Sequence, residues 1–262
     1  MSDAVLYDVS AAVATVTINR PDAMNSLDTA TKEALRDAVI RAADDEAIRA
    51  VVLTGSGRAF CVGQDLKEHS DNIQFHPEAV WNTVAEHFNP IAMALATMPK
   101  PVVAAVGGVA AGAGASFAFA CDFRILAETA GFNLAFTGVG LTADSGASWT
   151  LPRLVGRARA IELLMQPSTI SADRALAMGL ATSVVPTDEV LPRARELAGQ
   201  LADGPTVAYG AVKRSLTYAA THDLGSALAF ESEMQNLAGN TEDHLSAVRA
   251  FIAKEKPVFR GR

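Results

Sequence analysis

Three glycines, Gly108, Gly112 and Gly114, lie in an uncharged run over residues 101–121 and mark a place where a ligand can approach the main chain. Glycine has no Cβ atom, so neighbouring groups can come close to its backbone. The residues after Gly114 predict a helix, whose first N–H groups lack intrahelical partners and lie at the positive end of the helix dipole. The pattern indicates a site where backbone donors stabilise an anion.

A nucleotide-binding or membrane-spanning role for this run is less favoured, and a purely structural role remains open. A dinucleotide-binding loop needs a third glycine where Phe117 stands, and no Gly-Lys-Ser/Thr sequence follows as in a P-loop. The run is long enough to cross a bilayer, but its glycines and the lack of a second such segment argue against a membrane span. A strand–turn–helix unit that only supports the fold remains possible at this point.

Asp144 is a single carboxylate between two apolar stretches and is the candidate acid or base. An Asp just before a helix is more often an N-cap, and composition alone favours that interpretation. The position of Asp144 after the glycine-rich run favours a catalytic role instead.

The first part of the chain predicts strands joined by a helical crossover. Short β-branched alternation at residues 5–8 and Val13–Ile18 is typical of a hairpin. Asp28 can cap a helix with apolar residues at helical spacing, and residues 51–53 predict a buried strand. A strand, a helix and a strand at this spacing indicate a crossover unit.

The elements predicted next to the glycine-rich candidate anion site lie in the middle of the chain. A buried strand is predicted at Val102–Val106, followed by a loop at residues 107–114. Residues 67–75 are polar and irregular, which indicates a mobile loop or lid. Residues 81–98 predict a helix that ends at the prolines which follow.

Beyond Leu151 the pattern is mostly helical, and Thr241 with two acidic residues after it is a well-formed helix start. Apolar faces on helices at a chain end favour packing on a neighbouring subunit. The predicted helices cover residues 157–165, 171–178, 190–201, 207–220 and 224–237, with a last one after Thr241.

Composition limits the functional classes. Half of the residues are hydrophobic and the net charge is −7, which supports a sizeable core and argues against a general nucleic-acid partner. Cys61 and Cys121 lie in apolar runs, so reduced thiols are expected. The N-terminus shows no signal-peptide pattern, so we expect a cytoplasmic protein without a membrane segment.

Several motifs in order along the chain resemble the crotonase (enoyl-CoA hydratase/isomerase) superfamily. Residues 58–68 and 104–114 are similar to its two signature loops, and residues 17–27 to its first strand and coenzyme A loop. Residues 250–259 resemble its last helix. The resemblance covers essentially the whole chain.

The resemblance implies an α/β fold, the crotonase ββα spiral, with a C-terminal helical region for trimerisation. It implies an acyl-CoA-binding and catalytic core over residues 1–200, and an oligomerising region over residues 201–262 that completes the coenzyme A site. A homotrimer or a dimer of trimers is expected. The substrate would be an acyl group carried as a coenzyme A thioester, with no metal and no permanently bound cofactor.

The resemblance also assigns roles to individual residues. The N–H groups of Gln64 and Ala113 would bind the thioester oxygen as an enolate forms. Residues around coenzyme A would include Lys67, with Phe251 and Lys254 reaching the coenzyme A of a neighbouring subunit. The remaining coenzyme A positions are Ala23, Met24 and Asp65, although a structural role for the Asp65 carboxylate is favoured over a catalytic one.

Departures from the family pattern indicate which reaction is catalysed. Hydratases of the family use two glutamates, and Ser116 and Phe136 stand at those positions. Asp144 aligns with the lone catalytic aspartate of the 1,2-epoxyphenylacetyl-CoA isomerase type found in phenylacetate degradation. These features predict a one-aspartate enoyl-CoA isomerase, with Asn89, Ser116 and Phe136 in the substrate pocket.

Three alternatives remain. Family members are often enoyl-CoA hydratases of fatty-acid β-oxidation. An aspartate at this position is the nucleophile of aryl-CoA dehalogenases, but those enzymes have a His and a Trp where this chain has Asn89 and Phe136. From a different class, the chain could be a non-catalytic acyl-CoA-binding protein in which Asp144 only caps a helix.

Overall fold

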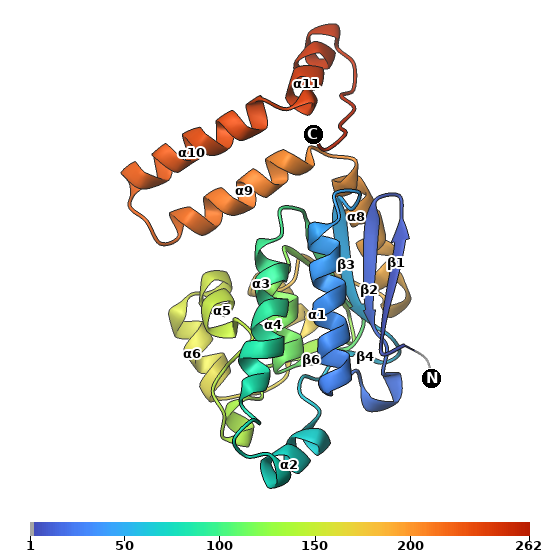
Figure 1. The fold of residues 1–262 in the computed structure, drawn as a ribbon, viewed down its shortest axis with the longest axis vertical. Helices are drawn as coiled ribbons and strands as arrows, with labels where there is room; N and C mark the ends of the chain where they lie inside the picture. Colours follow the sequence, from blue (N-terminus) through green and yellow to red (C-terminus); the bar gives the residue numbers. More distant parts are fainter. Residues whose placement is uncertain (1–2) are drawn as a thin grey trace.

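A six-stranded sheet in the order β1-β2-β3-β5-β7-β10 forms the frame of the fold in the computed structural model, which describes residues 3–262 (Figure 1). The first two strands form the predicted antiparallel hairpin, and the other pairs are parallel. The strands are β1 Val5–Ser10, β2 Val13–Ile18, β3 Ala50–Gly55, β5 Val102–Val106, β7 Phe123–Ala127 and β10 Ser183–Val185.

Helix α1, Thr29–Asp44, makes the predicted crossover between β2 and β3. Asp28 caps it, because its side chain accepts a hydrogen bond from the N–H of Thr31. Leu35 and Val39 lie on the buried face of the helix and join the core under the sheet. The local sequence signals therefore determine both the start and the inward face of α1.

A second sheet of four short strands, in the order β4-β6-β8-β9, lies beside the first. Its strand β6, Val109–Ala111, falls inside residues 107–114, so the prediction of a continuous loop there is wrong. β6 is a strand because β4 and β8 pair with it from both sides, and these partners come from distant parts of the chain. The other strands are β4 Ala59–Cys61, β8 Gly131–Asn133 and β9 Ile170–Ser171.

Helix α4, Ala113–Ala120, is buried along its whole length and carries only small and aromatic side chains. Gly108 and Gly114 allow the close packing around it. A Cβ atom on Gly108 would lie 2.0 Å from the carbonyl oxygen of Arg58, and one on Gly114 would lie 2.1 Å from that of Cys61. The glycines therefore bring the two signature loops together.

Residues 67–75 form a helix, α2 Leu66–Phe75, so the prediction of an irregular conformation is wrong there. Asp65 starts the helix by accepting hydrogen bonds from the N–H groups of Lys67 and Glu68. None of the residues of α2 is buried. Its apolar face is therefore weak, which is why the sequence pattern did not indicate a helix.

The predicted helix at residues 81–98 contains a π-helical turn, η2 Val84–Phe88, directly before α3 Asn89–Thr97. A π turn holds one residue more than an α-helical turn and is frequent at functional sites. The helices α5 Ala147–Val155, α6 Arg157–Met165 and α7 Ala172–Ala177 follow later in the chain, and α8 Val190–Ala202 packs on β3, β5 and β7.

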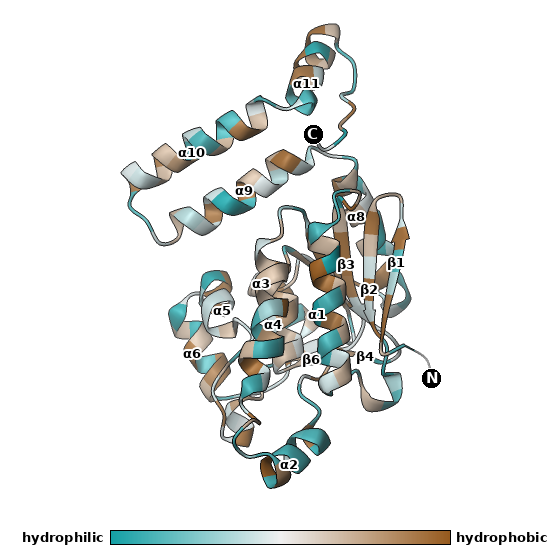
Figure 2. Ribbon diagram, in the orientation of Figure 1, coloured by the Kyte–Doolittle hydropathy of each residue, from teal (hydrophilic) through white to brown (hydrophobic). Residues whose placement is uncertain are grey.

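Three C-terminal helices project away from the sheets: α9 Thr206–Ala219, α10 Leu224–Gly239 and α11 Glu242–Ala253 (Figure 1). Arg49 ties this region to the sheet by donating to Thr206 Oγ1 and to the carbonyl of Phe259. Apolar and polar residues alternate along these helices (Figure 2), and the exposed large apolar residues include Val212, Leu216, Leu224, Leu228, Leu237, Leu245, Val248, Phe251 and Ile252.

Within residues 3–262, no helix combines the length and the apolar character that crossing a bilayer requires. Cys61 and Cys121 are free and buried, as expected from their apolar surroundings, and burial raises the pKa of each thiol to about 12.

Candidate active site

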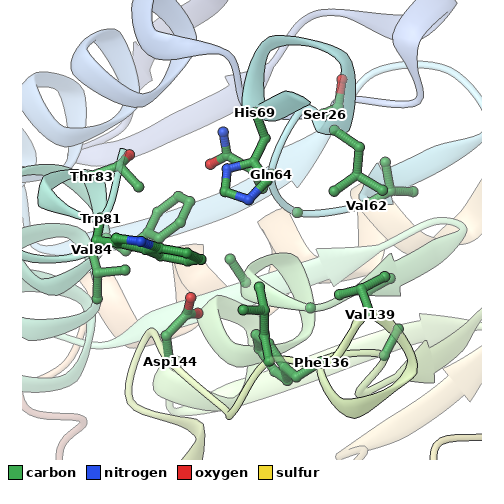
Figure 3. A pocket seen from close by; sticks show the side chains of 18 residues that line it. Ser26, Val62, Gln64, His69, Trp81, Thr83, Val84, Phe136, Val139 and Asp144 are labelled. Atoms are coloured by element: carbon green, nitrogen blue, oxygen red, sulfur yellow. The ribbon is translucent and has the colours of Figure 1, made fainter. Parts of the chain in front are cut away.

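A cavity of about 390 Å³ opens where the two signature loops, helix α2 and the π-helical turn meet (Figure 3). Residues 135–144 close its remaining side. The segments that line it are distant in sequence and are held in place by the second sheet and by α4. Most of its wall is apolar, so an electrostatic interaction inside it is stronger than in water.

Gln64 and Ala113, whose backbone N–H groups are the predicted donors to the thioester oxygen, both line this cavity. The neighbours of Gln64 are fixed on either side, because Leu27 donates to the carbonyl of Gly63 and accepts from the N–H of Asp65. A Cβ atom on Gly63 would lie 3.2 Å from the nitrogen of Ala113, so the two loops are in direct contact. Among residues 3–262, neither N–H donates a hydrogen bond to a protein group.

Gly112 makes the turn from β6 into α4, directly before Ala113. Its φ of +51° and ψ of −124° form a backbone conformation that residues with a Cβ atom rarely adopt. Ala113 is the first residue of α4, so its N–H has no partner within the helix. Within the described residues 3–262, the N–H groups of Gln64 and Ala113 are therefore both left without a protein partner.

The Asp144 side chain points into the cavity from the wall opposite His69 and Gln64 (Figure 3). It does not cap a helix, because α5 begins at Ala147 and has Gly146 at its N-cap position. The N-cap interpretation of Asp144 is therefore wrong. Burial raises the pKa of Asp144, and a hydrogen bond of 2.8 Å from Ser145 Oγ partly opposes this shift.

Aromatic side chains line the cavity around these groups. Trp81, Phe88 and Phe136 form parts of its wall. His69, on α2, also lines it and lies edge-on to Trp81 with 5.6 Å between ring centroids. Sequence reasoning missed His69 because residues 67–75 were expected to be irregular. Asp65 followed three residues later by Glu68 is the helix-start signal that could have placed it on a helix.

Comparisons with known proteins identify the family. The sequence profile of the enoyl-CoA hydratase/isomerase family matches residues 8–262. The chain belongs to the enoyl-CoA hydratase/isomerase family. It is 38% identical to the 1,2-epoxyphenylacetyl-CoA isomerase of Escherichia coli (strain K12), with all of both chains covered. It is 40% identical to a probable enoyl-CoA hydratase of Rhodobacter capsulatus, with 98% of each chain covered.

A solved structure supports the same assignment. The crystal structure of a putative enoyl-CoA hydratase/isomerase from Mycobacterium abscessus superposes with a TM-score of 0.95 at 44% identity, covering 99% of this chain and 100% of the other. The predicted α/β crotonase fold is thereby confirmed. This protein is an acyl-CoA enzyme of the enoyl-CoA hydratase/isomerase family.

Two of the residues predicted for the substrate pocket of this family member lie elsewhere. Asn89 is exposed at the start of α3, while the preceding residue, Phe88, turns into the cavity. Ser116 is fully buried in α4, where its hydroxyl donates to the carbonyl of Gly112. Asn89 and Ser116 therefore do not line this cavity, whereas Phe136 lies in its wall.

The predicted coenzyme A residues lie at two ends of the molecule. Ala23 and Met24 form and end the short 3-10 helix η1, Pro21–Ala23, and Lys67 is exposed on α2. Phe251 and Lys254 lie at the end of α11, far from the cavity within one chain (Figure 1). Their contact with the coenzyme A of a neighbouring subunit stays a prediction.

Asp65 has structural partners. Its carboxylate accepts hydrogen bonds from Ser26 at 3.0 Å and from Arg20 at 3.1 Å, besides capping α2. Burial alone would raise the pKa of Asp65, but these hydrogen bonds outweigh burial and hold the pKa below its usual value. Arg20 is also paired with Asp28 at 2.9 Å. No group of three metal-ligating side chains occurs in the described part of the chain.

Proposed function

We propose that this protein is an enoyl-CoA isomerase that moves a double bond between the 3,4 and 2,3 positions, with Asp144 as its single base. The observation that carries the proposal is that Asp144 is the only carboxylate among the described residues that line the cavity. Asp144 removes a proton from Cα, and the electron pair passes to the thioester oxygen to form an enolate. The same carboxyl group then returns the proton to Cγ.

The N–H groups of Gln64 and Ala113 would hold the enolate oxygen during this step. Losing one such donor typically lowers kcat by about 100- to 1000-fold. Proton transfer by a positioned side chain contributes about 100- to 10,000-fold. A raised pKa suits Asp144 to both halves of the reaction, since the group must accept a proton and then release it.

A single base is enough for a 1,3-proton shift, whereas addition of water is best served by two groups. Ser116 cannot supply the second group, because it is sealed in α4, and Phe136 has no proton to transfer. Hydration of a 2-enoyl-CoA is the second candidate function. His69 favours it, since its imidazole is the other titratable side chain among the described cavity residues.

The test offers a 3-enoyl-CoA and a 2-enoyl-CoA separately to the wild-type protein and to Asp144→Asn, in D₂O. We expect fast conversion of the 3-enoyl substrate with deuterium incorporation at Cα, both lost in Asp144→Asn while acyl-CoA binding survives. Asp173→Asn, an exposed aspartate on α7, is the matched control and should keep full activity. Unchanged turnover in Asp144→Asn would remove this residue from the mechanism.

The remaining outcomes separate the alternatives. Fast hydration of the 2-enoyl substrate, lost in His69→Gln, would establish the hydratase instead. Binding of both acyl-CoAs without deuterium exchange would leave only a binding role. Halide release from a haloaryl-CoA would indicate the dehalogenase, whose nucleophile would be Asp144.

The proposal also covers the kind of acyl group that the cavity holds and the assembly of the chain into oligomers. Trp81, Phe88 and Phe136 suit a flat, unsaturated or ring-type acyl group carried on coenzyme A. The exposed apolar residues of α9 to α11 suit burial against a neighbouring chain, as a homotrimer or a dimer of trimers would provide. In such an assembly Phe251 and Lys254 would reach the coenzyme A of the neighbour.

A further inference from the structure

Lys32, on α1, is a buried cation directly behind the wall of the cavity. Its side chain is 2% exposed. Its ammonium donates to Thr83 Oγ1 at 2.9 Å and to Gln64 Oε1 at 3.3 Å. A third contact, of 3.4 Å, joins it to the carboxylate of Glu68. The ammonium thus links α1 to three segments: the first signature loop through Gln64, α2 through Glu68, and the residue before the π-helical turn, Thr83.

Burying a charge is unfavourable unless its partners compensate, so a buried ammonium needs hydrogen-bond and charge partners. Burial lowers the pKa of Lys32, and the nearby Glu68 carboxylate opposes that shift. The ring of Phe88 adds a cation–π contact, with 5.7 Å from Nζ to the ring centroid. The hydrogen bonds, the Glu68 carboxylate and the Phe88 ring therefore hold the Lys32 ammonium in a fixed position.

Three of the groups that contact the ammonium also line the cavity: Gln64, Thr83 and Phe88. Gln64 is the residue whose backbone N–H is one of the two free donors. The hydrogen bond to its side chain restrains the same residue from behind the cavity wall. Thr83 is held in turn by His87, since 3.1 Å separate its hydroxyl from the imidazole Nδ1.

We propose that Lys32 is a positioning residue for the enolate-binding site. It acts through Gln64, by fixing the peptide whose N–H binds the thioester oxygen, and through Thr83, by fixing the adjacent wall. Its positive charge also favours the anionic enolate over the neutral thioester. The inference rests on the enolate-binding site of the proposed function.

The test compares Lys32→Met with Lys100→Met. Lys100 is the matched control, because its ammonium is also buried but donates to the carbonyls of Ala42 and Asp45, away from the cavity. Three quantities are measured: thermal stability, kcat and KM with a 3-enoyl-CoA, and the fraction of a bound 3-ketoacyl-CoA present as its enolate, from near-ultraviolet absorption.

Both variants should unfold at a lower temperature. Only Lys32→Met should lose activity, by up to about 100-fold in kcat with little change in KM, since displacing a reacting group slightly can have an effect of this size. Its enolate fraction should fall in parallel. Lys100→Met should keep the wild-type kcat and enolate fraction.

A double-mutant cycle with Gln64→Ala tests the route of the effect, since this change keeps the backbone N–H and removes the side chain. Non-additive losses in kcat would show that Lys32 acts through Gln64. If Lys32→Met does not fold, Thr83→Val breaks the shortest of the three Lys32 contacts from the other side. It should lower kcat and the enolate fraction in the same way.

The inference would be overturned if folded Lys32→Met kept the wild-type kcat and enolate fraction. If Lys32→Met does not fold, the same result in Thr83→Val would overturn it. The proposed function would remain intact in either case. An enolate signal in the wild-type protein without isomerase activity would instead refute the proposed function alone. A wild-type protein that binds the 3-ketoacyl-CoA only in its neutral form would refute the enolate-binding site, and the inference would fall with it.

Discussion

Ser145 donates its hydroxyl to Asp144 Oδ1 across 2.8 Å, and this is the one hydrogen bond that the Asp144 carboxylate accepts within residues 3–262. Ser145 is almost fully buried, so the hydroxyl is shielded from water. The hydrogen bond favours the ionised carboxylate, while burial favours the neutral acid. The balance of the two sets the pH at which the Asp144 carboxyl group ionises.

Ser145→Ala should therefore raise the pKa of Asp144 further. Because the ionised form is the base, the acid limb of the pH profile of kcat/KM should move to higher pH. Ser148→Ala, at an exposed serine on α5, should leave the profile in place. An acid limb that moves to lower pH in Ser145→Ala would contradict the assignment of Asp144 as the base.

Asp144→Asn should stabilise the fold at neutral pH while it lowers kcat by about 100- to 10,000-fold. Burial raises the folded-state pKa of Asp144, so folding loses stability as the pH rises from the unfolded-state pKa through the folded one. The amide of the Asp144→Asn variant does not ionise, so this variant does not lose this stability as the pH rises. The melting temperature should rise at pH 7 and should not rise below about pH 4, where both states hold the neutral acid. A lower melting temperature at pH 7 would contradict the raised pKa.

Gly114→Ala should destabilise the protein by about 3 kcal/mol or more, because the new Cβ would overlap the carbonyl of Cys61. The forced shift would also displace the N–H of Ala113, so kcat should fall. Gly199→Ala is the matched control, since no atom lies within 4 Å of its added Cβ in α8. It should stabilise the protein by up to about 1 kcal/mol. Urea denaturation of both variants measures the difference.

Asp65→Asn should lower the stability at pH 7 by up to about 1 kcal/mol, the usual size of a partly exposed ion pair. Its folded-state pKa is depressed, so its contribution is present above the unfolded-state pKa and is lost as the pH falls through the folded one. The difference in unfolding free energy between Asp65→Asn and the wild type should therefore disappear in strong acid. Asp37→Asn, at an exposed ion pair with Arg36, should show almost no gap at either pH.

Phe251→Ala tests the contribution of α11 to coenzyme A binding. Phe251 is 85% exposed, so its loss should leave the unfolding temperature of a single chain unchanged. If it covers the coenzyme A of a neighbour, KM should rise by about tenfold with little change in kcat. Leu245→Ala, on the same helix, should leave KM near the wild-type value. An unchanged KM in Phe251→Ala would remove this residue from the coenzyme A site.

The elements that the sequence predicts well are those whose signals are local. Asp28 and Thr241 both cap helices as expected, and the apolar spacing after Asp28 indicates the buried face of α1. The hairpin and the buried strand Val102–Val106 follow from short β-branched runs. Each of these features is determined by residues close to one another in the chain.

The features that the sequence did not predict depend on distant partners. β6 is a strand only because β4 and β8 lie on either side of it. α2 lacks a buried face, so no apolar period marked it, and His69 was missed with it. The sequence left the role of Asp144 open because it does not fix the first residue of α5. A helix capped by Asp144 and a helix with Gly146 at its N-cap position differ by only two residues, and a sequence pattern does not locate a helix start that closely.

The π-helical turn at Val84–Phe88 makes the shape of this cavity sensitive to the length of the chain. Its extra residue rotates everything before it by about 100° relative to a regular α-helix. Deleting one codon there would turn Thr83 and Trp81 away from Phe88 without replacing any of the three. A single insertion or deletion there would thus reshape one wall of the cavity, while Gln64, Ala113 and Asp144 lie on other segments of the chain.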